Sequence, residues 1–258
     1  MLLKFHKYQG TGNDFILIDN RTLFFPKNDT NLVSFLCDRK YGIGADGLIL
    51  LENDMGSDFS MVYYNSDGNE SSMCGNGGRC IVAFANELGM VDKKTSFNAI
   101  DGQHAATIGS GSVKLQMKNV LEIREKSDYY FLNTGSPHHV QMVENLEEMD
   151  VRSEGEKLRY GLYGQKGSNI NFVKQVNAET FAVRTYERGV ENETLSCGTG
   201  VTAVALAMDY AKKTISNTIY VITKGGQLQV SFEKNNNGYQ NITLTGPTQL
   251  VFKGEIQC

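Results

Sequence analysis

Three landmarks occur twice in this chain, and the two copies are always 123 positions apart, as from 74 to 197. The pairs are Cys74-Gly75-Asn76-Gly77 with Cys197-Gly198-Thr199-Gly200, Thr11-Gly12-Asn13 with Thr134-Gly135-Ser136, and Asn65 with Arg188. Each cysteine motif precedes an apolar stretch with helical spacing, and Asn65 and Arg188 each follow a strand-like run. Three coincidences at one offset indicate that the chain consists of two copies of one structural unit.

Both copies are predicted to be rich in strands and to contain one long helix. Helices are expected over 31–39, 77–88 and 199–210. Strands are expected over 2–6, 14–19, 47–51, 59–64, 96–100, 105–108, 112–117, 129–133, 140–143, 171–176, 180–186, 218–223, 227–232, 241–244 and 249–252. Asn235-Asn236-Asn237-Gly238 predicts a hairpin turn. The join near 118–127 is short and polar, so we expect the halves to pack together around a ligand site.

Composition narrows the class of protein. The chain has 258 residues and a net charge of −4, without a basic cluster of the kind that binds nucleic acid. Its longest apolar runs are far shorter than a membrane span. The first residues, Met1 to His6, begin an alternating strand rather than a signal peptide. We therefore expect a cytoplasmic protein that acts on a small molecule, with neither a nucleic acid nor a membrane as partner. A homodimer is compatible with the sequence, which does not determine the oligomeric state.

Of the five cysteines, three are expected to be structural. Cys37 and Cys80 lie in stretches that resemble buried helix faces, and Cys258 is the last residue. The spacing of Cys74 and Cys80 does not match a zinc site, and no pair of histidines with ligand spacing accompanies them. No metal site is therefore predicted.

Cys74 and Cys197 are each expected at the N-terminus of a helix. The unpaired N–H groups and positive end of a helix dipole lower the pKa of a thiol there and attract a carboxylate. If both helix ends bind one carboxylate, its α-carbon lies between two sulfurs. One thiolate can then remove the α-proton while the other thiol delivers a proton to the opposite face. Such a site inverts a stereocentre without a cofactor. The alternative is a redox pair, although the two cysteines do not form a Cys-x-x-Cys motif.

The motifs resemble those of the diaminopimelate epimerase family, which works without pyridoxal phosphate, and the resemblance covers nearly the whole chain. They are Gln9 to Phe15, Gly42 to Gly47, Asn65 to Gly68, Met73 to Cys80, Gly135 to His138, Asn169 to Phe172, Tyr186 to Gly189 and Cys197 to Gly200. The resemblance implies an α/β (α+β) fold of two pseudo-symmetric halves, each a β-rich, barrel-like shell around a central helix. The first half would contain residues 1–118 with the returning segment 250–258, and the second residues 119–249.

The resemblance also implies a reaction and a set of site residues. The substrate would be LL-diaminopimelate, converted to the meso form for lysine and peptidoglycan-precursor biosynthesis, and no cofactor or metal would take part. Cys74 and Cys197 would be the two bases. The distal amino-acid group of the substrate would be held by Asn13, Asn65, Asn169 and Arg188. Glu187 and His138 would bind the reacting amino group. Amides for the reacting carboxylate would come from Gly75, Asn76, Gly198 and Thr199.

Two positions depart from the family pattern. Gly47 and Ser136 stand where many members have glutamine and asparagine, so the distal contacts must differ from those members. Related cofactor-independent racemases and epimerases acting on proline or hydroxyproline are the main alternative. Phenazine-pathway isomerases share the architecture but do not need two cysteines. A thiol redox or binding protein is the alternative from another class.

Overall fold

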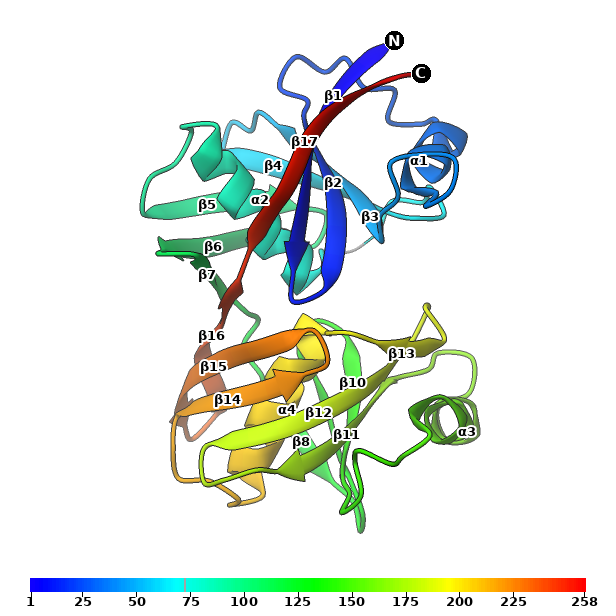
Figure 1. Ribbon diagram of the computed structural model, residues 1–258. Helices are drawn as coiled ribbons and strands as arrows, with labels where there is room; N and C mark the ends of the chain where they lie inside the picture. Colours follow the sequence, from blue (N-terminus) through cyan, green and yellow to red (C-terminus); the bar gives the residue numbers. More distant parts are fainter. Residues whose placement is uncertain (72) are drawn as a thin grey trace. The chain divides into compact units, whose positions relative to one another are not determined.

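A computed structural model of the chain describes residues 1–71 and 73–258. The chain divides into two compact units (Figure 1). Unit 1 contains residues 1–115 and 246–258, and unit 2 contains residues 116–245. The last segment of the chain thus returns to the unit in which the chain begins.

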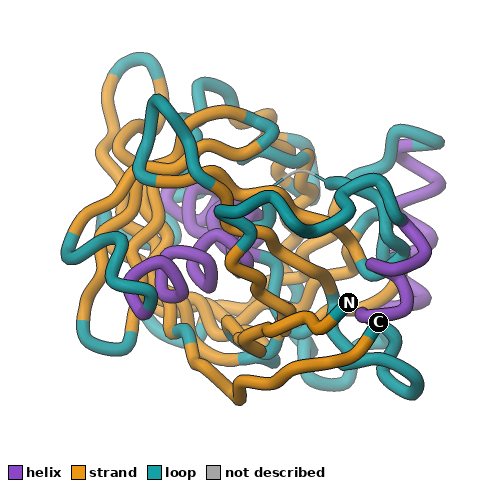
Figure 2. Tube along the Cα trace, turned by 90° about the horizontal axis from the view of Figure 1, so that it is seen from above, coloured by secondary structure: helices purple, strands orange, loops and turns teal. Residues whose placement is uncertain are grey.

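Unit 1 is a series of paired strands closed by the two chain ends. In order of pairing, they are β17 (Gln249–Gln257), β1 (Leu2–Gly10), β2 (Asn13–Asp19), β3 (Gly47–Glu52), β4 (Phe59–Asn65), β5 (Lys94–Ala99), β6 (Gly102–Gly109) and β7 (Ser112–Gln116). Among the pairs of described residues in this series, only β2–β3 and β4–β5 are parallel. Because β1 pairs with β17 along its whole length, the N- and C-termini lie side by side (Figures 1 and 2).

Unit 2 repeats this pattern. Its strands are β8 (Ile123–Glu125), β9 (Tyr130–Asn133), β10 (Pro137–Met142), β11 (Asn169–Gln175), β12 (Thr180–Glu187), β14 (Thr218–Thr223), β15 (Gly226–Asn235) and β16 (Gly238–Pro247), with β13 (Asn192–Thr194) paired to β12. In the part of the chain that the structure describes, two pairs of this series, β10–β11 and β12–β14, are again parallel. The two units have the same order of parallel and antiparallel pairs, so the predicted fold class is confirmed.

A long helix lies inside each set of strands. Helix α2 (Gly75–Glu87) contacts β1, β2, β3, β4 and β6, and α4 (Gly198–Tyr210) contacts β9, β10, β11, β12, β14 and β15. Both helices are buried on nearly every side, which is why most of their residues are apolar or small, with Asn76 and Arg79 of α2 as buried polar residues. Both begin slightly earlier than predicted, because the glycines after each cysteine already adopt helical geometry.

Two further helices cover the outside of the strands. Helix α1 (Thr30–Cys37) was predicted and is capped by the side chain of Asp29, which accepts from the Leu32 N–H. Helix α3 (Val151–Tyr163), β8 and β13 were not predicted. The predicted hairpin turn at 235–238 connects β15 to β16. Among the described residues, no helix combines the length and apolar character that crossing a membrane requires.

Candidate active site

Cys74 and Cys197 occupy the same structural position in their respective units. Each is the N-cap residue of the buried helix, with an extended backbone at φ −92° and ψ 129° for Cys74 and φ −119° and ψ 110° for Cys197. Neither helix has an acidic residue in its first turn. The first backbone N–H groups of a helix have no partner within it, so each cysteine stands beside a place suited to a carboxylate.

Cys74 lies next to the side-chain amide of Asn13, which in turn contacts the side-chain amide of Asn76. Its Sγ is 3.5 Å from Oδ1 of Asn13, and the same oxygen accepts a hydrogen bond from Nδ2 of Asn76 at 3.3 Å. Nδ2 of Asn13 donates to Oδ2 of Asp46 at 2.6 Å. Asn13 is placed here by a two-residue hairpin between β1 and β2, in which Thr11 and Gly12 both have positive φ, as tight hairpins require.

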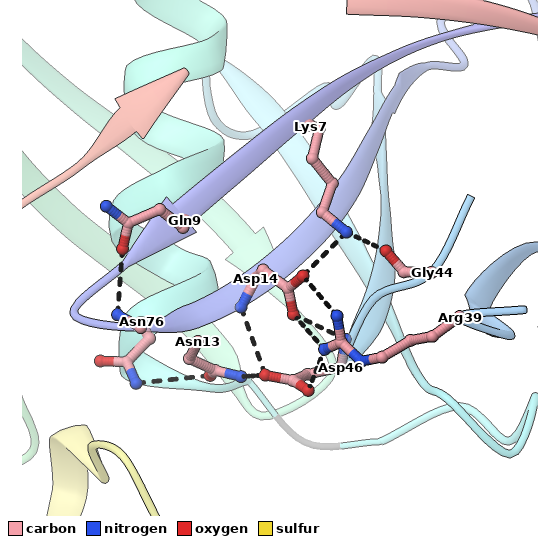
Figure 3. A network of polar contacts seen from close by, with 9 residues as sticks. Lys7, Gln9, Asn13, Asp14, Arg39, Gly44, Asp46 and Asn76 are labelled. Carbon is pink, nitrogen blue, oxygen red and sulfur yellow. Dashed lines mark hydrogen bonds and ion pairs between the residues drawn. The ribbon is translucent and has the colours of Figure 1, made fainter. Parts of the chain in front are cut away.

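Asp46 belongs to a network of alternating charges (Figure 3). Its Oδ1 accepts from Nη2 of Arg39 at 2.8 Å, and Arg39 also makes a bidentate pair with Asp14 at 2.7 and 3.0 Å. Lys7 lies 2.8 Å from Asp14 on the other side. Burial alone would raise the pKa of Asp14, but the hydrogen bonds from Arg39 and Lys7 outweigh it and lower the pKa to about 2.

Arg79 lies fully buried beneath the first turn of α2. Its guanidinium donates to three neutral acceptors, which are the carbonyl of Gly75 at 3.2 Å, the hydroxyl of Thr11 at 3.2 Å and Oδ1 of Asn76 at 3.0 Å. Burial lowers the pKa of Arg79, while Cys80 and Cys74 act in the opposite direction. A buried cation held by neutral groups adds positive potential to the end of the helix where an anion would bind.

Cys197 has different neighbours. Its Sγ is 3.5 Å from the Thr199 hydroxyl, which is 2.9 Å from Nε2 of His138. Nδ2 of Asn171 donates to the His139 carbonyl at 2.8 Å and lies 3.2 Å from Nδ1 of His138. Since an amide nitrogen only donates, Nδ1 of His138 is the acceptor and Nε2 carries the hydrogen. His138 therefore donates to the Thr199 hydroxyl, whose own hydrogen is available to Cys197.

His138 is neutral in this setting. Its side chain is fully buried, and burial, followed by the nearby charge of Arg188, lowers its pKa to about 3. Gly200 brings Asn171 and α4 together, because a Cβ at this glycine would lie 2.5 Å from Oδ1 of Asn171. Thr185 donates to the same Oδ1 at 3.0 Å. The whole group behind Cys197 is thus hydrogen-bonded without a formal charge of its own.

Asn169 and Arg188, both predicted to contact substrate, are held together in unit 2. Oδ1 of Asn169 accepts the Arg188 backbone N–H at 2.9 Å, and its Nδ2 donates to the Ser136 hydroxyl at 3.0 Å. The exposed guanidinium of Arg188 donates to the Lys166 carbonyl at 2.9 Å and approaches Ser136 at 3.5 Å. Glu187 is the half-buried last residue of β12, directly before Arg188.

Asn65, which precedes Arg188 by 123 positions, is the exposed last residue of β4 in unit 1, the position that Glu187 has in β12. Its backbone is part of a turn in which the Gly68 N–H donates to the Asn65 carbonyl at 3.0 Å. The structure therefore brings Asn13 and Asn76 together with Cys74, and His138 and Thr199 together with Cys197.

The remaining thiols have another environment. Burial raises the pKa of Cys37 and of Cys80 to about 12, and the Cys80 side chain is fully buried. Thiols of this kind stay protonated and unreactive near neutral pH. This agrees with their predicted structural role.

Gly47 has no room for the side chain that many family members carry there. A Cβ at Gly47 would lie 2.5 Å from the ring of Tyr63 and 2.6 Å from the Tyr64 carbonyl. Tyr63 thus occupies the space that a side chain at position 47 would need.

Asp46, Arg79 and Asn171 belong to the site although no role was predicted for them. One signal was available, because Asp46 and the predicted site residue Asn169 are themselves 123 positions apart. Each of the two contacts the residue at the equivalent hairpin position, Asn13 or Ser136.

The sequence is similar to known epimerases over nearly its full length. A family model described as diaminopimelate epimerase matches residues 5–120 and 130–251. The diaminopimelate epimerase of Flavobacterium psychrophilum is 60% identical over 256 residues, which covers 98% of this chain and 100% of that protein. The diaminopimelate epimerase of Chlorobaculum tepidum is 41% identical over 258 residues, covering 96% of this chain and 98% of that protein.

Solved structures with much lower identity share the fold. A phenazine biosynthesis protein of the PhzF family from Bacillus anthracis has a TM-score of 0.79 at 14% identity, with all of both chains covered. A hydroxyproline epimerase from Agrobacterium vitis has a TM-score of 0.71 at 14% identity, covering 99% of this chain and 92% of that chain. The sequence relationship distinguishes among these groups, and by it this chain belongs to the diaminopimelate epimerase family.

Proposed function

We propose that this protein interconverts LL-diaminopimelate and meso-diaminopimelate by acid–base chemistry at two thiols, without a cofactor. The observation that carries the proposal is the occurrence of Cys74 and Cys197 at the N-caps of two equivalent buried helices. The family relationship at 60% identity gives the substrate. The reaction would supply lysine and peptidoglycan-precursor biosynthesis in the cytoplasm.

The reacting carboxylate is proposed to bind the first-turn amides of the two helices, which are those of Gly75, Asn76, Gly198 and Thr199. One sulfur, as thiolate, takes the α-proton, and the electron pair of the broken C–H bond spreads into the carboxylate. The amides stabilise that added charge. The other thiol then transfers its proton to the opposite face of the same carbon. At the end the thiol and thiolate have exchanged, so the total charge is unchanged and the enzyme is ready for the reverse reaction.

The distal end of the substrate carries both an ammonium and a carboxylate. Arg188 is proposed to bind the distal carboxylate, with Asn13, Asn65 and Asn169 as further polar contacts. Support comes from the bond between Asn169 and the Arg188 backbone, which keeps these two residues in register.

The reacting ammonium is proposed to bind Glu187. His138 has hydrogen-bond partners for both ring nitrogens, so we propose that it acts one step behind the substrate, through Thr199.

The test is conversion of LL-diaminopimelate in deuterated water, stopped at low conversion, with separation of stereoisomers and mass spectrometry. Product should carry deuterium at the inverted carbon while recovered substrate remains largely unlabelled, because one sulfur removes the hydrogen and the other delivers a solvent-derived one. Product that keeps its original hydrogen would contradict the two-thiol mechanism. L-Lysine, which lacks the distal amino-acid group, is the matched control and should react poorly.

The proline-type alternative is not favoured, since its structural representative is similar in fold alone. Proline in the same assay is the direct check. Turnover of proline with kcat/KM comparable to that of diaminopimelate would replace the proposed substrate.

A further inference from the structure

Charged residues fix the orientation of both amides beside Cys74. Arg79 donates to Oδ1 of Asn76, which turns Nδ2 of Asn76 toward Asn13. The Asp46 carboxylate accepts from Nδ2 of Asn13 at 2.6 Å. A guanidinium only donates and an ionised carboxylate only accepts, so neither amide can be reversed without losing a charge-assisted bond. Oδ1 of Asn13 is therefore the atom presented to Cys74.

This orientation affects the protonation of the sulfur. With Oδ1 of Asn13 at 3.5 Å, the Cys74 S–H has an acceptor, and a hydrogen bond from the protonated form favours that form. The positive end of α2 acts in the opposite direction. A reversed Asn13 amide would present N–H groups instead and would add to the helix effect in stabilising the thiolate.

Asp46 is held firmly although its side chain is 43% exposed. Arg39 donates a hydrogen bond to one carboxylate oxygen of Asp46, and the Asp14 backbone N–H donates to the other at 3.3 Å. Arg39 is itself fixed by its bidentate pair with Asp14. Figure 3 shows the Asp46 carboxylate with Asn13 on one side and Arg39 on the other.

We propose that Asp46 is a positioning residue for Cys74: by holding the Asn13 amide in one orientation, it keeps the proton on the Cys74 sulfur before substrate binds. The catalytic meaning, that Cys74 is the acid in the direction of the reversible reaction that starts from this resting form, rests on the proposed function. In unit 2 the equivalent residues Asn169 and Ser136 are hydrogen-bonded to each other, and the Thr199 hydroxyl lies 3.5 Å from the Cys197 sulfur.

Other titratable groups surround this cluster. Arg79 and Cys80 come from α2, Lys7 and Asp14 from β1 and β2, and Arg39 from the segment after α1. Arg79 favours the Cys74 thiolate and so opposes Asp46. Replacing Asp46 leaves Arg79 and its three hydrogen bonds in place, so the variant isolates the effect of the Asn13 orientation.

The experiment measures thiol reactivity without substrate. Wild type and Asp46→Ala are pulsed with iodoacetamide across a pH series, and labelling of Cys74 and Cys197 is quantified by peptide mass spectrometry. In Asp46→Ala the labelling midpoint of Cys74 should move down by about one pH unit, the size expected for one neutral hydrogen bond. The midpoint of Cys197 should not move. Asp46→Asn, which keeps the shape of the side chain, should give a smaller shift in the same direction.

Two controls make the result specific. Asp19→Asn removes another aspartate of unit 1, paired with Arg21 at 2.6 Å, and should leave the Cys74 midpoint unchanged. In an Asn13→Leu background, which has no amide to orient, Asp46→Ala should cause no further shift of the Cys74 midpoint.

An unchanged or raised Cys74 midpoint in folded Asp46→Ala and Asp46→Asn would overturn the proposal, as would an equal shift of both thiols. Because no substrate is present, these outcomes are separate from failure of the epimerase assay.

Discussion

The two helix N-termini share a backbone plan but differ in the side chains around the sulfur. In unit 1, Asn13 is held by the charged Asp46, and Arg79 lies buried under the first turn. In unit 2 the equivalent residues are Ser136, Asn169 and Thr202, all uncharged. The hairpin residue contacts its partner in both units, at 2.6 Å between Asn13 and Asp46 and 3.0 Å between Ser136 and Asn169.

This difference indicates that the position of each thiol and its reactivity are determined by different parts of the structure. The strand order and the glycines after each cysteine put both sulfurs at helix N-caps. The hydrogen-bond partners then distinguish them, with a fixed acceptor beside Cys74 and a hydroxyl beside Cys197. A reaction that needs one acid and one base at the same time is served by two thiols that are alike in place and unlike in protonation.

The largest expected effect tests whether the cysteines at both N-caps are needed for catalysis. Cys74→Ser and Cys197→Ser should each lower the rate of epimerisation by roughly 10²–10⁴-fold, the usual contribution of one acid–base group. Steady-state kinetics with LL-diaminopimelate provide the measurement. Cys80→Ser is the control, because its thiol is buried and its pKa is raised to about 12. A Cys80 variant as inactive as the Cys74 variant would refute the assignment.

The next effect compares Arg188 with Asn65, the residue 123 positions before it. Arg188→Lys replaces a planar fork by a point charge and should lower kcat/KM by about 10- to 100-fold, as expected for loss of a charge-assisted hydrogen bond. Asn65→Ala removes only a neutral contact and should lower kcat/KM about 2- to 10-fold. Equal losses in the two variants would show that the units share the distal group evenly.

Much of the fold could be predicted because its signals are local. Apolar stretches after glycine-rich starts predicted α2 and α4, and alternating or apolar runs predicted most strands. Helix α3 was not predicted because its buried residues are Val151, Gly155 and Arg159, which do not form a large apolar stripe. It packs through Gly155, where a Cβ would lie 2.4 Å from Tyr186. Its one usable signal was the capping residue Asp150, which accepts from the Ser153 N–H.

The two thiols of the site could be predicted from the sequence, whereas most of the residues around them could not. Cys74 and Cys197 follow from the repeat. The network of Lys7, Asp14, Arg39 and Asp46 brings together three separate segments, and no spacing in the sequence relates them. The orientation of the Asn13 amide depends on which groups hydrogen-bond to its nitrogen and to its oxygen. Only the folded structure shows these partners.

A smaller effect concerns the two buried histidines of β10, His138 and His139. Burial lowers the pKa of His138 to about 3 and of His139 to about 4, so both protonate more readily in the unfolded chain. The free energy of unfolding should therefore fall as pH drops from about 6.5 toward these values, by about 2 kcal/mol per histidine between pH 7 and pH 5. Denaturant unfolding at several pH values measures this slope.

His138→Gln and His139→Gln should each flatten that slope, because glutamine does not titrate. The window above pH 5 avoids Asp14, whose pKa is lowered to about 2 and whose stabilising effect is lost only below its unfolded value of 3.8. A slope that is the same in wild type and both variants would show that acid sensitivity does not arise in unit 2.

The smallest expected effect concerns the residues below the first turns of the two helices, Thr202 in α4 and Arg79 in α2. The Thr202 hydroxyl donates to the Gly198 carbonyl at 3.0 Å, as Arg79 does to the Gly75 carbonyl at 3.2 Å. Thr202→Val keeps the shape and removes one neutral hydrogen bond, so the free energy of unfolding should fall by about 1 kcal/mol. Because Thr202 carries no charge, the pH midpoint for alkylation of Cys197 should stay where it is in wild type. A shifted midpoint would mean that the uncharged Thr202 affects the protonation of Cys197. Thr202 and Arg79 would then no longer differ in their effect on the neighbouring thiol.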